Sequence, residues 1–266
     1  MKTLLISLSV LAAIILIVWL GLQVKPKAFS MPRLMRGDIQ TVPLPEGLPA
    51  PVERFYRQVY GSEVPLVETV TLIGRGSMRP FGVWLPARFV MVHNAGRDYR
   101  HYFEATFFGI PFLKVNEGYL DGKSFFESPM GSYYDDPNTN QAANLALWAE
   151  GIWFPALWVT DPRLRWQAVD DQTAILYVPY KESEENFVVR FNPQTGLIDR
   201  MEAMRYKNPG DAAKTLWIAN EVPAVEDKPA EFYLTWLDAG KPWAAFTIEE
   251  MEFNLEVSEY IGGRGY

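Results

Sequence analysis

The stretch NTNQAANLALWAEGIWFP, residues 138–155, interrupts a chain that otherwise alternates like a β-sheet protein. Its alanines, leucines and two tryptophans recur at helical spacing. Asp136 followed by Pro137 favours a helix start, because aspartate caps free amide groups and proline suits the first turn. Pro155 should end the helix. The sequence therefore predicts one apolar helix near residues 137–154, too hydrophobic to stand alone in water.

Strand patterns lie on both sides of this helix. Segments such as 67–79 and 99–108 are rich in β-branched and aromatic residues, alternate with period two and are separated by turns. Segment 250–257 alternates cleanly between glutamate or asparagine and apolar residues, which indicates one buried and one solvated face. About ten strands are expected, and a twisted sheet of that size must curl or close. The predicted fold is mainly β (α+β), a long curved, half-barrel-like antiparallel sheet with the apolar helix packed in its concave side.

The N-terminal segment Thr3–Leu22 contains no charged residue. Twenty helical residues span about 30 Å, the thickness of the hydrocarbon layer. No good A-x-A site follows, so a retained single-pass anchor is favoured over the alternative, a signal peptide with an unusual cleavage site. The expected organisation is a transmembrane anchor at 1–24, a proline-rich stem at 25–50 and a single curved-sheet domain at 51–266.

The amino-acid composition excludes some classes of binding partner and some kinds of catalytic or metal site. The 266 residues include 25 basic and 32 acidic ones, a formal net charge of −7, and the acidic residues all follow the apolar segment. An acidic domain is a poor partner for nucleic acid. The absence of cysteine removes disulfides, a thiol nucleophile and a zinc–thiolate site.

The side of the membrane stays open. Four basic residues follow the apolar segment before the first acidic residue, Asp38. They favour a cytoplasmic domain by the positive-inside rule, but they would equally hold the stem against anionic headgroups.

Several motifs occur in one order along the chain. They are RGSMR (75–79), AEGIWFPALW (149–158), WQAVDD (166–171) and FNPQTGLIDRMEAMRY (191–206), followed by the segment 235–257. In these the chain resembles an uncharacterised bacterial family of membrane-anchored domains of unknown function, over roughly residues 65–260. That resemblance implies a fold similar to the half-barrel of lipoprotein carriers and related lipid-binding proteins. The chain departs from those carriers in having a helical anchor and no lipid-modified cysteine.

The two histidines, His93 and His101, lie on neighbouring predicted strands. A two-residue turn at Ala95–Gly96 would set His93 opposite Asp98 and His101 opposite Val90, leaving the pair out of register. No H-x-H or H-E-x-x-H motif is present, so no metal ligand and no cofactor is expected. No nucleophile elbow or phosphate-binding loop occurs either, and the sequence predicts no catalytic residue and no enzyme.

Polar residues inside apolar segments are the best candidates for a site. Glu150 lies in the predicted helix among tryptophans, and a buried carboxylate is costly unless it is paired. We expect it to pair with Arg79 or Arg205, either as a structural ion pair or as the polar end of an apolar pocket. The candidate ligand-binding residues are Trp148, Glu150, Trp153, Trp158, Arg79 and Arg205.

Two functions remain open from the sequence. The first is a non-catalytic, membrane-anchored domain that holds a lipid or another hydrophobic molecule between sheet and helix. The second is a structural or interaction protein whose tryptophans fill the interior and whose sheet docks a partner protein. Several hundred Å³ of cavity would favour the first, and a packed interior would favour the second.

Overall fold

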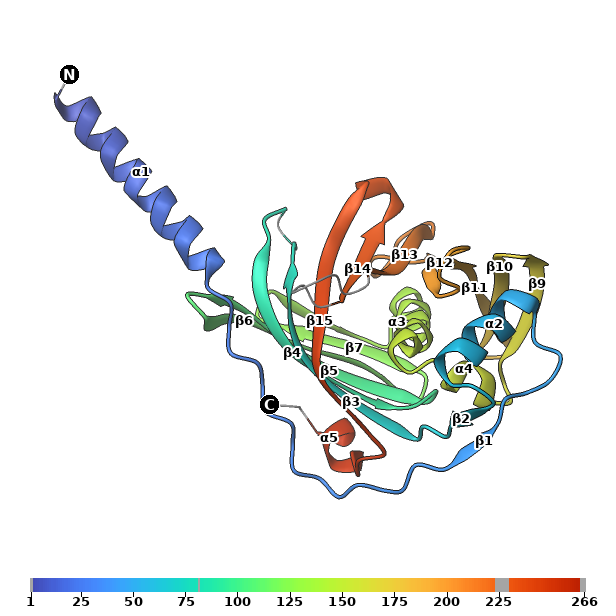
Figure 1. Ribbon diagram of the computed structural model, residues 1–266. Coiled ribbons are helices and arrows are strands. Elements are labelled where there is room, and N and C mark those ends of the chain that lie inside the picture. Colours follow the sequence, from blue (N-terminus) through green and yellow to red (C-terminus); the bar gives the residue numbers. More distant parts are fainter. Residues whose placement is uncertain (1, 81, 223–229, 264–266) are drawn as a thin grey trace.

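The computed structural model describes residues 2–80, 82–222 and 230–263. They form one 13-stranded antiparallel sheet and a small two-stranded one. The large sheet is curved, and helix α3 (Pro137–Ala149) lies in its concave side (Figure 1). The predicted mainly β fold with an enclosed apolar helix is confirmed.

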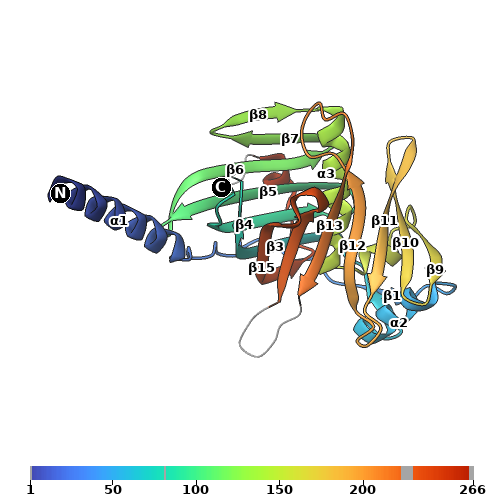
Figure 2. The ribbon, with the colours of Figure 1, turned by 90° about the horizontal axis from the view of Figure 1, so that it is seen from above.

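The large sheet has the order β8-β7-β6-β5-β4-β3-β15-β14-β13-β12-β11-β10-β9 (Figure 2). One meander precedes α3 and a second follows it. The last strand, β15, pairs with the first strand of the large sheet, β3, with Phe246 opposite Gly76, so the two meanders make a single sheet. The strands are β1 (Thr41–Pro43), β2 (Glu63–Pro65), β3 (Thr69–Met78), β4 (Leu85–Asn94), β5 (Asp98–Phe107), β6 (Ile110–Leu120), β7 (Lys123–Ser128), β8 (Gly131–Tyr134), β9 (Arg165–Asp170), β10 (Thr173–Tyr180), β11 (Ser183–Phe191), β12 (Ile198–Arg205), β13 (Thr215–Val222), β14 (Glu231–Trp236) and β15 (Lys241–Phe253).

Helix α3 begins where the sequence predicts. Asp136 Oδ1 accepts hydrogen bonds of 3.0 Å from the backbone N–H groups of Asn138 and Thr139, which caps the first turn. Every residue from Thr139 to Ala149 is buried, because the sheet wraps around the helix. The other helices are α1 (Lys2–Gln23), α2 (Ala50–Val59), η1 (Glu150–Trp153), α4 (Leu157–Thr160), η2 (Leu237–Ala239) and α5 (Ser258–Gly262).

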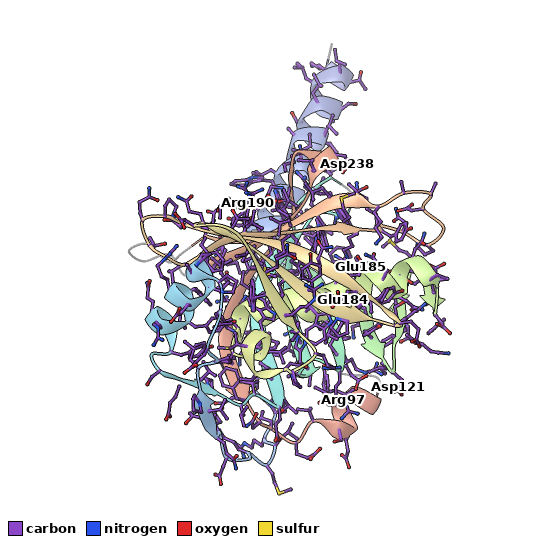
Figure 3. All side chains as sticks on the ribbon, turned by 90° about the vertical axis from the view of Figure 1, so that its right-hand side faces the viewer. Arg97, Asp121, Glu184, Glu185, Arg190 and Asp238 are labelled. Carbon is purple, nitrogen blue, oxygen red and sulfur yellow. The ribbon has the colours of Figure 1, made fainter. Side chains whose placement is uncertain are left out.

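At strand β11 the sheet has a buried inner face and a charged outer face. On β11, the side chains of Phe187, Val189 and Phe191 are buried. Figure 3 shows charged residues of the same strand, among them Glu184 and Arg190, on the outside of the molecule. This alternation is typical of an antiparallel sheet that covers a core on one side and faces water on the other.

Helix α1 is long and apolar enough to cross a membrane, by length and composition. Its last turn meets the sheet, where the backbone N–H of Phe108 donates a 2.9 Å hydrogen bond to the carbonyl oxygen of Gly21. The following residues, 24–40, run along the sheet rather than away from it (Figure 1). Gly37 N–H donates to the carbonyl oxygen of Asn254 at 2.7 Å, which fixes this segment to the end of β15.

Asn254 should be important for stability, because it holds three segments together. Its Oδ1 accepts from Glu68 N–H at 2.9 Å, and its Nδ2 donates to the Asp38 carbonyl at 3.1 Å. Its φ of 56° lies in the left-handed region, which alanine adopts at a cost. We expect Asn254→Ala to lower the free energy of unfolding by about 1–3 kcal/mol. Urea denaturation of the full chain measures this, and an equal loss in the exposed-site control Asn186→Ala would contradict it.

Candidate functional site

A mostly apolar cavity lies between the sheet and the helical segment α3–η1. Its volume is about 200 Å³. Ala146, Ala149 and Trp153 line it from the helical side, and Trp153 packs edge-on against Phe232 with 4.7 Å between ring centroids. The sheet contributes the aromatic rings of Phe103, Phe126, Trp217, Phe232, Trp243 and Phe246.

Four charged or titratable side chains also line the cavity: His101, Glu117, Glu150 and Arg205. Nε2 of His101 lies 2.9 Å from Oε2 of Glu150, and Nδ1 of His101 lies 3.4 Å from Oε1 of Glu117. Behind them, Nε2 of the fully buried His93 lies 3.0 Å from the same Glu150 oxygen. One carboxylate oxygen therefore contacts both imidazoles.

The β4–β5 hairpin brings the two histidines together. Asn94 pairs with Asp98, so the turn has three residues: Gly96 takes a φ of 70°, and Arg97 N–H donates to the Asn94 carbonyl at 2.9 Å. His93 then faces Tyr99 and His101 faces Met91, which places both histidines on the inner face with 5.4 Å between ring centroids. The expected two-residue turn and the out-of-register pair are wrong, because Arg97 adds one residue to the turn and shifts the register.

The expected arginine partner of Glu150 is also wrong. Within the described part of the chain, the ion-pair partners of Glu150 are His93 and His101, and no arginine lies within 4.0 Å of it. The guanidinium of Arg205 instead stacks over the Trp217 ring at 4.5 Å, and its Nε donates to the Ala142 carbonyl at 3.0 Å. Arg205 thus connects the C-terminal end of β12 to α3.

The three groups shift one another's pKa values. Burial alone would raise the pKa of Glu150, but the two histidines outweigh it and lower the pKa to about 2. Burial opposes the charged form of His101, yet Glu150 and Glu117 raise its pKa to about 9. Burial dominates at His93 and lowers its pKa. The carboxylate is thus held ionised at the wall of an apolar cavity.

A comparison with known protein families identifies the family of this chain. A model described as a family of unknown function, DUF6544, matches residues 38–246. The chain belongs to DUF6544. The expected membership of a family of unknown function is confirmed, and no curated protein matches this DUF6544 chain.

Three solved structures are similar to this DUF6544 chain, each with a TM-score of 0.39. A domain from Vibrio parahaemolyticus, assigned to outer membrane lipoprotein sorting, is 10% identical, and the match covers 72% of this chain and 88% of that one. A DUF1329 family protein from Desulfovibrio piger is 12% identical, with 79% and 92% covered. A LolA superfamily protein from Nitrosomonas europaea is 8% identical, with 70% and 84% covered. These distant likenesses do not bear on what this chain binds.

The structure places the candidate ligand-binding residues of the DUF6544 chain in three different environments. Glu150, Trp153 and Arg205 line the cavity. Trp148 and Trp158 are each 1% exposed and belong to the packed core, where Trp158 Nε1 donates to the Trp148 carbonyl at 2.9 Å. The remaining candidate, Arg79, is not one of the lining residues, and its guanidinium lies over the ring of Trp84 at 5.3 Å. A binding role for any of them stays a prediction.

Sequence reasoning missed His93, His101 and Glu117 as members of the site. The signal that could have found the histidines is the glycine at position 96, since hairpin loops of three residues commonly carry glycine in the left-handed region. That loop length puts His93 and His101 on one face. For Glu117 the signal is weaker, because its place opposite His101 follows only from the register of β5 and β6.

Proposed function

We propose that this DUF6544 protein is a membrane-anchored, non-catalytic binding domain that holds a lipid chain or another hydrophobic molecule between the curved sheet and α3. The observation that carries the proposal is the aromatic-lined cavity of about 200 Å³ beside Trp153. Small-molecule sites are typically concave, largely apolar and equipped with a few polar groups. His101, Glu150 and Arg205 are such groups on the wall of this cavity.

The size of the cavity limits the occupant. Its volume of about 200 Å³ is below the roughly 300–1,000 Å³ of pockets that enclose a drug-sized ligand. It therefore suits a segment of one acyl chain rather than a whole lipid. An apolar occupant would supply the van der Waals contacts that the lining of an empty cavity lacks.

An exposed apolar turn supports uptake from a bilayer. Phe108, Ile110 and Phe112, in and next to the β5–β6 turn, are 43%, 69% and 54% exposed. The turn lies at the end of α1, where Phe108 is hydrogen-bonded to Gly21 (Figure 2). Exposed apolar clusters are typical of membrane or partner contact sites. With α1 in the bilayer, these side chains would lie at its surface.

The cavity extends toward that same end of the sheet. Met78, the last residue of β3, and Leu113, near the start of β6, both line it. The charged group around Glu150 lies farther along the strands, beside Met91 and His101. An acyl chain entering from the membrane side would meet apolar residues first and the polar wall last.

The tight interior favours the second candidate, a structural protein that docks a partner. Trp148, Trp158 and Phe154 are each 1% exposed and belong to the main hydrophobic core under the sheet. On this alternative the cavity is a packing defect, and no lipid enters it.

Photo-crosslinking distinguishes the two functions. The full chain would be placed in liposomes with a phospholipid that carries a diazirine in one acyl chain, and labelled peptides would be mapped by mass spectrometry. The binding function predicts label on the peptide that contains Ala146 to Trp153, in addition to α1. Label confined to α1 would refute that function and favour the structural protein.

Ala146→Phe fills the cavity, and we expect it to reduce the label at the site by roughly tenfold, the change that about 1.4 kcal/mol of lost contact produces. Label on α1 should not change, which provides an internal reference. Ala168→Phe, at an exposed position of β9, is the matched control and should keep the wild-type pattern. Equal labelling in both variants would show that the lipid lies elsewhere.

A further inference from the structure

The only two histidines of the chain meet at one carboxylate. His93 and His101 come from neighbouring strands and are 0% and 1% exposed, and Glu150 reaches them from the end of α3. One ligand-type atom from each of the three residues lies within 4.8 Å of the other two. Three residues whose side chains can bind transition metals therefore converge on one buried point.

The contacts have hydrogen-bond distances but not hydrogen-bond directions. Nε2 of both histidines lies 2.9–3.0 Å from Glu150 Oε2. Even so, within the described residues none of these three atoms takes part in a hydrogen bond of acceptable angle, and neither does Nδ1 of His93. Buried polar atoms without a protein partner are rare in native proteins, and such atoms commonly contact a buried water or an ion.

The other ring nitrogen of His101 is oriented as in metal sites. Its Nδ1 lies 3.4 Å from Oε1 of Glu117. A metal-bound histidine typically donates its second N–H to a carboxylate, which fixes the tautomer that leaves Nε2 free to bind the ion. If Nδ1 of His101 carries the proton, its Nε2 lone pair faces the Glu150 carboxylate, and a proton, a metal ion or a bridging water between them removes that repulsion.

We propose that His93, His101 and Glu150 bind a Zn²⁺ ion through the two imidazole Nε2 atoms and the Glu150 carboxylate. Two histidines and one glutamate form a known Zn²⁺ donor set, with bonds of about 2.0–2.2 Å that place neighbouring ligand atoms roughly 3.3–3.6 Å apart in a tetrahedral site. The two nitrogen–oxygen separations of 3.0 and 2.9 Å are a few tenths of an ångström shorter, so the side chains would move apart slightly to admit the ion.

The ion would have one coordination position directed at the cavity. His101 and Glu150 line the cavity, whereas His93 lies behind them. Water or an anionic group of the occupant would complete the coordination. The site differs from the sequence-based expectation of no metal, and it does not depend on the proposed lipid binding, since a lipid-free protein could hold the ion.

Metal content and histidine NMR test this site. The full chain, purified in detergent without a polyhistidine tag and stripped with EDTA, would be incubated with Zn²⁺ and freed of excess metal. We expect close to one Zn²⁺ per chain by elemental mass spectrometry and a shift of both ¹⁵N-labelled histidine side-chain signals. No retained Zn²⁺ together with unshifted signals would overturn the proposal, whatever the lipid crosslinking shows.

Two ligand variants and one control separate this site from adventitious surface binding. His101→Asn and Glu150→Gln should weaken Zn²⁺ binding by more than the roughly 10–100-fold that loss of an outer-shell partner costs. Glu117→Gln, which changes only the outer carboxylate, should retain the ion within that range. Unchanged binding in both ligand variants would overturn the assignment. If these variants do not fold, the histidine signals of the wild-type chain still decide it.

Discussion

Replacing Trp158 by alanine is expected to lower the free energy of unfolding by about 3–5 kcal/mol, the range for removing a fully buried large aromatic side chain. Trp158 is 1% exposed, lies edge-on to Trp166 and donates through Nε1 to the Trp148 carbonyl at 2.9 Å. The variant would leave a void beside α3 and remove the indole hydrogen bond to the Trp148 carbonyl. Urea unfolding of the detergent-solubilised chain, followed by far-UV circular dichroism, measures the change.

Trp153→Ala is the matched comparison, because Trp153 is only half-buried and lines the cavity. Its removal enlarges a space that already exists and is expected to lower stability by clearly less than the Trp158 change. Losses of the same size would mean that Trp153 belongs to the core rather than to a cavity wall. That result would count against the binding function as well.

Local patterns were sufficient to predict most elements of the fold. Alternation with period two marks the strands, and Asp136 with Pro155 brackets the helical segment, because capping and proline chemistry act over a few residues. The pairing of β15 with β3 could not be predicted, because the two strands lie at opposite ends of the domain's sequence and no local pattern specifies their contact. The expected ten strands were an underestimate for the same reason: the count depends on which short segments find partners in the sheet.

The site was harder to predict than the fold, because it depends on registers and on three-dimensional packing. Glu150 was recognised as a buried carboxylate in need of a partner, but its partners follow from one extra residue in the β4–β5 turn. Arg205 lines the cavity as expected but does not pair with Glu150. Tryptophans at 148 and 158 resemble Trp153 in sequence, and only the packing of α3 and α4 shows that they point into the core.

Replacing Glu150 by alanine in the EDTA-treated chain is expected to lower the free energy of unfolding by about 3–5 kcal/mol, as for other buried charged groups that lose their partner. His93 and His101 would both lose the oxygen that lies 3.0 and 2.9 Å from them. Glu117→Ala is the control: Glu117 is 34% exposed and contacts His101 at 3.4 Å, so we expect a loss of at most about 1 kcal/mol. Urea unfolding at neutral pH measures both.

A triple replacement of His93, His101 and Glu150 by leucine then tests why the cluster is present. Buried ionic groups can often be exchanged for apolar residues without loss of stability, so the triple variant should recover most of what Glu150→Ala loses. The carboxylate also lies at the C-terminal end of α3, where the helix dipole disfavours a negative charge, so the position is not explained by helix stability. Recovery would therefore mean that folding does not require the cluster and that the role of the cluster is to bind a ligand. A triple variant as unstable as Glu150→Ala would instead assign the cluster to the structure of the protein.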